Sequence, residues 1–313
     1  MVSPGPGPGV MPAGALLPAL ALLLNAFVWG VSWWPFRQLQ AHGLHPLWAT
    51  ALIYLVSVCA LLAVRPRALG AFARYPMLWV LVAASGFTNV GFNWAVTVGD
   101  VVRVVLLFYL MPAWTVLLAW PLLGEKPTPA ALMRLALAMA GVIIILKTPE
   151  VPWPVPESTA DWLALLGGFS FALTNIMLRK LRQVPAEGRI AAMFGGGAIT
   201  AATVAGLGWT LGVVDAPPTL QPSWAWIALV LSLGFLAGNI ALQYGAARLR
   251  AHTTALVMLS EVVFAATSSV LLGASELGLR TWVGGALILA AAAWSGWPER
   301  DTAGADNGAK SRA

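Results

Sequence analysis

Apolar residues in this chain form ten long runs separated by short polar breaks. A helix needs about 20 mostly apolar residues to cross the hydrocarbon core of a bilayer, and each run approaches that length. In chain order the runs are Ala15–Trp34, Leu47–Val64, Met77–Val98, Val104–Leu123, Ala130–Leu146, Trp162–Leu178, Ile190–Val214, Trp224–Tyr244, Thr253–Leu272 and Trp282–Trp297. The pattern predicts an all-α integral membrane protein with ten transmembrane helices.

Composition supports a membrane protein rather than a soluble one. Hydrophobic residues make up 59% of the 313 residues and charged residues only 10%. That is too little charge to cover the surface of a soluble domain of this length. The lipid bilayer is therefore the expected surrounding of the chain.

The longest polar break divides the runs five and five, which predicts two repeats. The break contains four prolines and three acidic residues between residues 147 and 161. The predicted organisation is a disordered N-terminus (1–14), a first five-helix repeat (15–147), a linker (148–161), a second repeat (162–297) and a disordered cytoplasmic tail (298–313). Both ends are rich in small or polar residues, which disfavours a packed core.

Polar residues recur at one spacing in the two repeats. Two trios stand 150 positions apart: Asn89, Asn93 and Trp94, then Asn239, Gln243 and Tyr244. In each trio two amides are four residues apart and so share a helix face. Because five crossings is an odd number, the second repeat must start on the opposite side of the membrane. The sequence therefore predicts inverted repeats, as in many secondary transporters.

The distribution of positive charge predicts the orientation. With the N-terminus in the cytoplasm, fourteen Lys and Arg residues fall on the inner side and four on the outer side. Such a bias predicts that both termini are cytoplasmic in a bacterial-type inner (plasma) membrane. The net charge of +6 then reflects topology, and no nucleic-acid partner is expected.

Glu261 is the strongest single candidate for function. It stands near the middle of the ninth run. A carboxylate at that depth costs about 2.5 to 3.5 kcal/mol on insertion scales unless it is protonated, paired or hydrated. Two interpretations are open: Glu261 binds a substrate amine or carries a coupling proton, or it is a structural acid whose hydrogen bonds hold a helix in place.

Other polar and aromatic residues inside the runs are candidates to line a substrate cavity. The full set is Asn25, Trp29, Trp33, Asn89, Asn93, Trp94, Tyr109, Trp114, Asn175, Asn239, Gln243 and Glu261. For the amides the alternative is hydrogen bonding between helices, and for the rings it is packing.

Two further residues, one inside the fourth run and one at its outer entrance, are of interest. Pro112 breaks the hydrogen-bond ladder and is a candidate hinge. Arg103 either extends to lipid phosphate or attracts carboxylate-bearing solutes.

The chain resembles EamA-type members of the drug/metabolite transporter superfamily over nearly its whole length. One mark is the segment Ala26–Arg37 with Trp29, Gly30 and Ser32, and another is the fourth run from Pro112 to the Leu-Gly-Glu turn at Glu125. The resemblance implies a bundle of ten helices with a central cavity lined from both repeats. The fifth and tenth helices would lie outside that cavity.

The likeness has departures and one finer feature. Glu261 stands where the family often has Glu-Pro, but Val262 replaces the proline, and Gly273 to Glu276 replaces the second Leu-Gly-Glu turn. The segment Tyr109–Pro112, followed by Thr115 and Leu117, is similar to the fourth helix of aromatic amino-acid exporters.

These observations predict a secondary transporter that exports small metabolites, with amino acids, and aromatic ones first, as candidate solutes. The alternatives are a passive channel, a multidrug or cation exporter, and an intramembrane lipid-modifying enzyme. The sequence has no Walker-type glycine loop and no metal-ligand motif, so neither a cofactor nor a metal is expected. Coupling to protons or to the solute's own gradient, and a monomer or homodimer, are left open.

Overall fold

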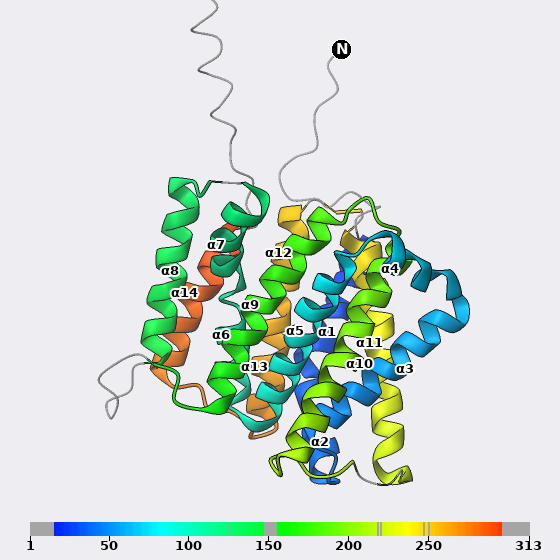
Figure 1. The fold of residues 1–313 in the computed structure, drawn as a ribbon. Coiled ribbons are helices and arrows are strands. Elements are labelled where there is room, and N and C mark those ends of the chain that lie inside the picture. The colour runs from blue at the N-terminus through cyan, green and yellow to red at the C-terminus, as the bar shows by residue number, and fades with distance from the viewer. Residues whose placement is uncertain are drawn as a thin grey trace, which may run out of the picture.

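The computed structural model describes residues 16–124, 126–146, 155–217, 219, 221–246, 248–249 and 251–295, with the backbone only at 251, 252, 255, 256 and 295. The predicted disordered ends lie outside these residues, as does the first half of the predicted linker (148–154). Helices form all the regular secondary structure of this part of the chain (Figure 1). They are α1 (Leu16–Val31), α2 (Trp33–Ala41), α3 (Pro46–Val64), the 3-10 helix η1 (Pro66–Leu69), α4 (Gly70–Arg74), α5 (Leu78–Val98), α6 (Val101–Phe108), α7 (Met111–Leu123), α8 (Pro129–Leu146), α9 (Thr159–Lys180), α10 (Ala186–Thr210), α11 (Pro222–Ala246), α12 (Ala251–Met258), α13 (Ser260–Leu271) and α14 (Leu279–Ser295).

Seven spans in the described residues are long and apolar enough to cross a membrane. The pairs α1–α2 and α6–α7 each count as one, and α3, α8, α9, α10 and α11 complete the set. An eighth results if α5 is counted with η1 and α4, which are bent from it by 116°. The apolar helices α13 and α14 are shorter.

The helices differ from the ten apolar runs in two ways. The first run ends at Trp34, whereas α2 continues to Ala41. The last turns of α2 carry Arg37 and other polar residues, so the apolar run stops before the helix does. The fourth and ninth runs are each broken, at residues 109–110 and at Leu259. The other boundaries shift by a few residues.

Helix caps fix where several of these elements begin and end. The Asp100 carboxylate accepts from the Arg103 amide at the start of α6, and the Ser158 hydroxyl accepts from the Asp161 amide at the start of α9. Such caps satisfy amide groups that have no partner within the helix. At the end of α7, Gly124 takes the left-handed conformation with φ of 74°, which favours glycine.

The two ends of the bundle differ in charge. Arg74 ends α4, and Lys126 and Arg182 lie in connections, where the ends of α7 and α9 approach the start of α5. We call this the basic end, at the top of Figure 1. Asp100 and Asp161 lie at the opposite end, which we call the acidic end.

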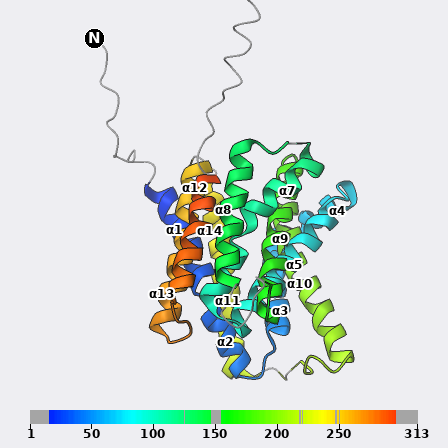
Figure 2. The same cartoon turned by 90° about the vertical axis from the view of Figure 1, so that its left-hand side faces the viewer.

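Most helices of the first half have a counterpart, in the same order, in the second half, and the two counterparts make matching contacts with the opposite half. α5 packs on α9, and its counterpart α11 packs on α1; α6 and α7 pack on α9, and their counterparts α12 and α13 pack on α1. The pairs α3–α10, α6–α13 and α8–α14 join counterparts to each other. α8 and α14 lie at the left-hand edge of the bundle in Figure 1, and Figure 2 shows them side by side on the face turned towards the viewer. The packing is thus nearly unchanged when the two halves are swapped.

Close approach between counterpart helices depends on glycine. A Cβ on Gly141 of α8 would lie 2.6 Å from the Gly284 carbonyl oxygen of α14, and a Cβ on Gly284 would lie 2.7 Å from that of Gly141. Any side chain at either position would separate the two backbones.

Candidate functional site

Two broken helices meet near the centre of the bundle at Tyr109 and Glu261. Tyr109 follows the last residue of α6, and Glu261 is the second residue of α13. The Tyr109 hydroxyl lies 3.2 Å from a carboxylate oxygen of Glu261 and 3.2 Å from the Met258 carbonyl oxygen, to either of which it can donate. Tyr109 is 3% exposed and Glu261 8%. Irregular backbone at membrane depth is tolerated only where protein or a cavity surrounds it, and it is a recurrent feature of transporter sites.

Each break is held against a glycine of the opposite half of the chain. A Cβ on Gly168 of α9 would lie 2.6 Å from the Phe108 carbonyl oxygen. A Cβ on Gly30 of α1 would lie 2.7 Å from the Glu261 carbonyl oxygen. Pro112, in the first turn of α7, has no N–H to donate back to Phe108. The second break has no proline, and the Val262 amide donates to Leu259 there.

Aromatic rings connect this junction to both halves of the bundle. The Trp29 ring of α1 stacks on Phe235 of α11 with centroids 4.5 Å apart, and it meets Phe92 of α5 edge-on at 6.0 Å. Phe92 contacts Phe108 at 4.8 Å, and Phe108 contacts Tyr109 at 6.4 Å. Of the candidate residues, Trp29 and Tyr109 are therefore brought together with Glu261, through rings that the sequence analysis did not select.

Trp33 lies on the acidic side of the same junction. Its indole N–H donates to the Ser268 hydroxyl of α13 at 3.0 Å. The Arg37 guanidinium lies 5.2 Å from the centre of the Trp33 ring and donates to the Gly99 carbonyl at 2.6 Å. Arg37 thereby links α2 to the C-terminal end of α5, where a cation is favourable.

Asn89 and Asn93 bond between helices rather than face an open cavity. The Tyr54 hydroxyl donates to the Asn89 side-chain oxygen, and the Asn89 amide donates to the Ser85 carbonyl. The Asn93 amide donates to the Thr50 hydroxyl at 3.3 Å, while its side-chain oxygen is buried without a partner in the described part of the chain. Both contacts join α5 to α3 and match the structural alternative for amides.

Asn25 is a buried amide with neither polar atom bonded within the described residues. It is 1% exposed and faces α11, where a Cβ on Gly238 would lie 3.3 Å from its side-chain nitrogen. An unpaired buried amide costs about 1 to 3 kcal/mol. Asn25 therefore remains a candidate for contact with a solute or a water molecule.

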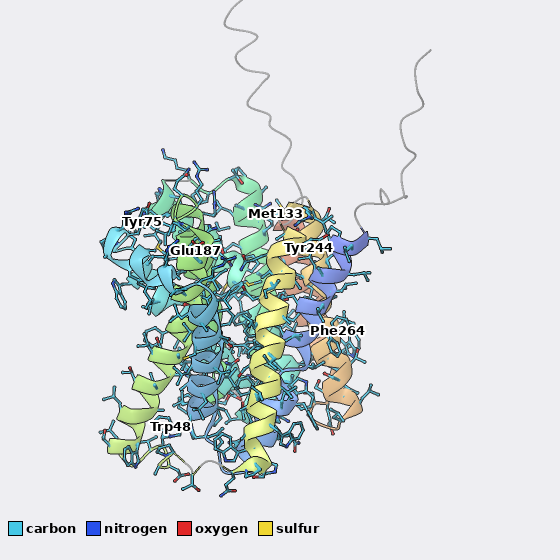
Figure 3. The ribbon with its side chains drawn as sticks, turned by 90° about the vertical axis from the view of Figure 1, so that its right-hand side faces the viewer. Trp48, Tyr75, Met133, Glu187, Tyr244 and Phe264 are labelled. Carbon is cyan, nitrogen blue, oxygen red and sulfur yellow. The ribbon has the colours of Figure 1, made fainter. Side chains whose placement is uncertain are left out.

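The second trio of the repeated pattern lies away from this centre. The Gln243 amide donates to the Asn239 side-chain oxygen at 2.7 Å, and this bond is exposed. The Arg248 guanidinium lies 3.9 Å from the centre of the Tyr244 ring. Figure 3 shows Tyr244 towards the basic end and Trp48 at the opposite end. Asn239 and Gln243 are thus not brought together with Glu261.

Trp94 and Trp114 lie in different surroundings. Trp94 meets His45 edge-on at 5.3 Å and packs near α10, towards the acidic end. Trp114 of α7 meets Phe169 of α9 edge-on at 5.7 Å, and its buried indole N–H has no partner in the residues that the structure describes. Of these two tryptophans, only Trp114 belongs to the broken helix α6–α7.

A cavity of about 450 Å³ opens between α7, α8 and α9. Asn175 is the one candidate amide that lines it, and Pro112 lies in its wall. The complete lining is Met111, Pro112, Thr115, Val116, Ala119, Lys126, Pro127, Thr128, Ala131, Arg134, Asn175 and Arg179. α8, the fifth apolar run, contributes Ala131 and Arg134, although the family resemblance implies that this helix lies outside a central cavity.

Arg103 makes an ion pair that the sequence analysis did not anticipate. Its guanidinium binds both carboxylate oxygens of Asp161, at 2.8 and 2.9 Å, and donates to the Ile145 carbonyl at 3.2 Å. Arg103 is thus held within the protein rather than directed to lipid phosphate. The capping pair Ser158 and Asp161 was the signal that a helix start, and so a fixed carboxylate, lies here.

The fold and its broken helices define a multi-pass membrane protein. The family model described as the EamA-like transporter family matches twice, over residues 16–147 and 158–297. The chain belongs to this family, whose members are membrane transporters of small molecules. The expected membership is confirmed, and so is a two-repeat arrangement.

Comparison with other proteins adds the fold alone. One solved structure, described only as "Crystal structure of protein", is 20% identical and has a TM-score of 0.55. The match covers 90% of this chain and 97% of that chain. No curated protein matches the chain.

Proposed function

We propose that this protein is a secondary transporter that exports small metabolites across a bacterial-type inner membrane, with amino acids, and aromatic ones first, as candidate solutes. Its ten helical units, counting α1–α2, α6–α7 and α12–α13 as one each, cross the membrane as two inverted repeats. The basic end faces the cytoplasm, in keeping with the bias of positive charge.

The observation that carries the proposal is the meeting of the two broken helices at Tyr109 and Glu261. α6–α7 and α12–α13 are counterparts under the exchange of halves, and Tyr109, at the break between α6 and α7, contacts Met258 of α12 and Glu261 of α13. Such an exchange-related pair of interrupted helices, with a carboxylate between them, is the arrangement from which alternating access operates around a fixed site.

Helix direction supports inversion of the repeats. Arg37 near the end of α2 binds the end of α5, and Arg103 at the start of α6 binds both the start of α9 and the end of α8. The first helix of the first half therefore ends at the acidic end, whereas the first helix of the second half begins there.

The cavity suggests which face is open. Its lining runs from Lys126 and Arg179 at the basic end to Met111 and Pro112 beside the break. At the other end the ion pair of Arg103 with Asp161 holds α6 against α9. This conformation corresponds to a carrier open towards the cytoplasm and closed on the outer side.

Counterflow in proteoliposomes tests the proposal. Vesicles loaded with excess unlabelled amino acid are given the labelled form outside, with phenylalanine, leucine and serine in parallel. Saturable, transient accumulation of one class is expected for a carrier. A folded protein without accumulation of any of the three would remove amino acids as solutes, and flux without counterflow would indicate a channel.

A further inference from the structure

The cavity between α7, α8 and α9 opens at the basic end, and the family resemblance gives its lining no role in binding a solute. We propose that it binds solutes through a carboxylate or another oxyanion, so that the acid group and not the amine is what the cytoplasmic mouth of the carrier recognises. The proposal rests on the proposed function, because it names the chemical class that the same pathway admits.

The charged side chains in the lining carry one sign. Lys126 comes from the turn between α7 and α8, Arg134 from the second turn of α8, and Arg179 from the last turn of α9. No carboxylate is present among the described residues of the wall. Glu125 precedes Lys126 and lies outside the described residues, and counting it as a full charge still leaves the mouth net positive.

Three separate segments bring these cations to one hollow, which distinguishes them from other basic residues at this end. Lys180 follows Arg179 directly and is exposed like it, yet only Arg179 lines the cavity. A cation of that kind serves as a topological anchor at the headgroups. Clefts lined by charge of one sign concentrate the field and attract ligands of the opposite sign.

The donor groups suit an oxyanion. A guanidinium carries five N–H donors in a planar fork, so an arginine held by a neighbour keeps donors for a ligand. Asn175 lies in the same wall and adds an amide. The Thr115 hydroxyl donates to the Met111 carbonyl at 2.9 Å and is therefore already committed as a donor.

The remaining wall suits the body of a small organic acid. Met111, Val116 and Ala119 supply apolar surface beside the polar groups. The volume of about 450 Å³ lies within the range of about 300 to 1,000 Å³ typical of small-molecule sites. Met111 and Pro112 adjoin the break at Tyr109, so the inner end of the cavity lies beside this break.

Matched acids and amines test the proposal on the full-length protein in nanodiscs. The probes are 3-phenylpropionate, phenylalanine and 2-phenylethylamine, and the readout is the concentration-dependent rise in melting temperature, which reports binding to the folded state. The two acids are expected to stabilise the protein and the amine to have at least tenfold weaker affinity. Raising the salt concentration should weaken the binding of the two acids, because salt screens the attraction between charges. Equal affinity for acid and amine, or no binding of either acid, would overturn the proposal.

Variants locate the site. Arg134→Gln and Arg179→Gln should each weaken acid binding about tenfold, Arg134→Lys and Arg179→Lys should retain more of it, and Lys180→Gln is the matched control that should leave it unchanged. Asn175→Asp adds a negative charge with little change of shape. It should weaken the binding of the acids and strengthen the binding of 2-phenylethylamine. Wild-type affinities in all of these variants would place the binding elsewhere.

The failure of this inference and that of the proposed function are distinguishable. Counterflow that shows no preference for acids, with unchanged rates in the arginine variants, would leave the carrier standing and remove the oxyanion site. Acid binding that depends on Arg134 and Arg179 without any counterflow would support the oxyanion site and remove the proposed transport function.

Discussion

At the scale of single residues, the contact between Tyr109 and Glu261 accounts for how a carboxylate is held at the depth of the bilayer. Glu261 is buried, and one of its oxygens accepts from a hydroxyl that is itself buried. Both interpretations of Glu261 predict that this bond matters, since a hydrogen bond to a charged group contributes about 1.5 to 3 kcal/mol. They differ in whether the carboxyl group takes part in transport, by binding a substrate amine or by carrying a proton.

Substitution of Glu261 separates the two interpretations. Glu261→Gln keeps the shape and an acceptor for Tyr109 but removes the acid. A coupling or amine-binding role predicts at least a tenfold slower transport and loss of its pH dependence, measured by counterflow at several pH values. Glu276→Gln, an exposed acid in the connection before α14, is the control. Wild-type rates with unchanged pH dependence would leave Glu261 a structural role only.

His45 offers a pH-dependent effect outside the spans. Its ring nitrogen accepts from the Leu47 amide at the start of α3, and burial lowers the pKa of His45, against the opposing effect of Asp215. The folded protein then binds its proton less readily than the unfolded chain, so stability should fall as pH drops from the ordinary value near 6.5 through the lowered pKa.

Thermal unfolding in detergent between pH 7.5 and 5 measures this effect. His45→Asn keeps a capping acceptor but does not titrate, so the acid-dependent loss should be smaller in the variant. An identical pH profile in both proteins would show that other groups cause the loss.

At the scale of elements, the interrupted helices could be predicted only in part. Pro112 indicated a break in the fourth run, because proline lacks the N–H that the ladder needs. The break at Leu259 has no such marker. It depends on packing against Gly30, a contact between distant segments that local sequence does not report. Similarly, the apolar pattern did not predict the last turns of α2, because the residues there are polar.

The hinge hypothesis for Pro112 gives a kinetic prediction. Pro112→Ala restores an N–H and favours a continuous helix across residues 109–110, so transport should slow several-fold while the half-saturation concentration changes less. Pro121→Ala, within the same helix but towards the basic end, is the matched control. A change in affinity alone, with the maximal rate preserved, would argue against a hinge.

The ion pair between Arg103 and Asp161 gives a prediction for stability. Asp161 is 2% exposed and Arg103 24%, so the coupling should lie below the value for a fully buried pair, at about 1 to 3 kcal/mol. A double-mutant cycle with Arg103→Gln and Asp161→Asn, read by unfolding free energy, measures it. Additive effects within about 0.5 kcal/mol would show that the two residues do not stabilise each other.

At the scale of the whole molecule, the apolar pattern predicted an all-helical membrane protein and local marks predicted the family, but neither located the site. Periodic recurrence of Asn89 and Asn239 correctly indicated duplicated helices, yet Asn89 and Asn93 are buried between helices, whereas Asn239 is half-buried and Gln243 is exposed. Equivalent positions in two repeats can have different neighbours, and spacing alone cannot reveal this. The rings Phe92, Phe108 and Phe235 were missed because apolar aromatics are common in any membrane helix.

Accessibility of one engineered cysteine tests alternating access most directly. The chain has a single cysteine, Cys59, so Cys59→Ser with Thr115→Cys places one thiol in the cavity wall. A membrane-impermeant thiol reagent should label it from the basic end, and excess solute on the opposite side should slow that labelling as carriers turn outward. Equal labelling from both sides, unaffected by solute, would contradict alternating access and favour a channel.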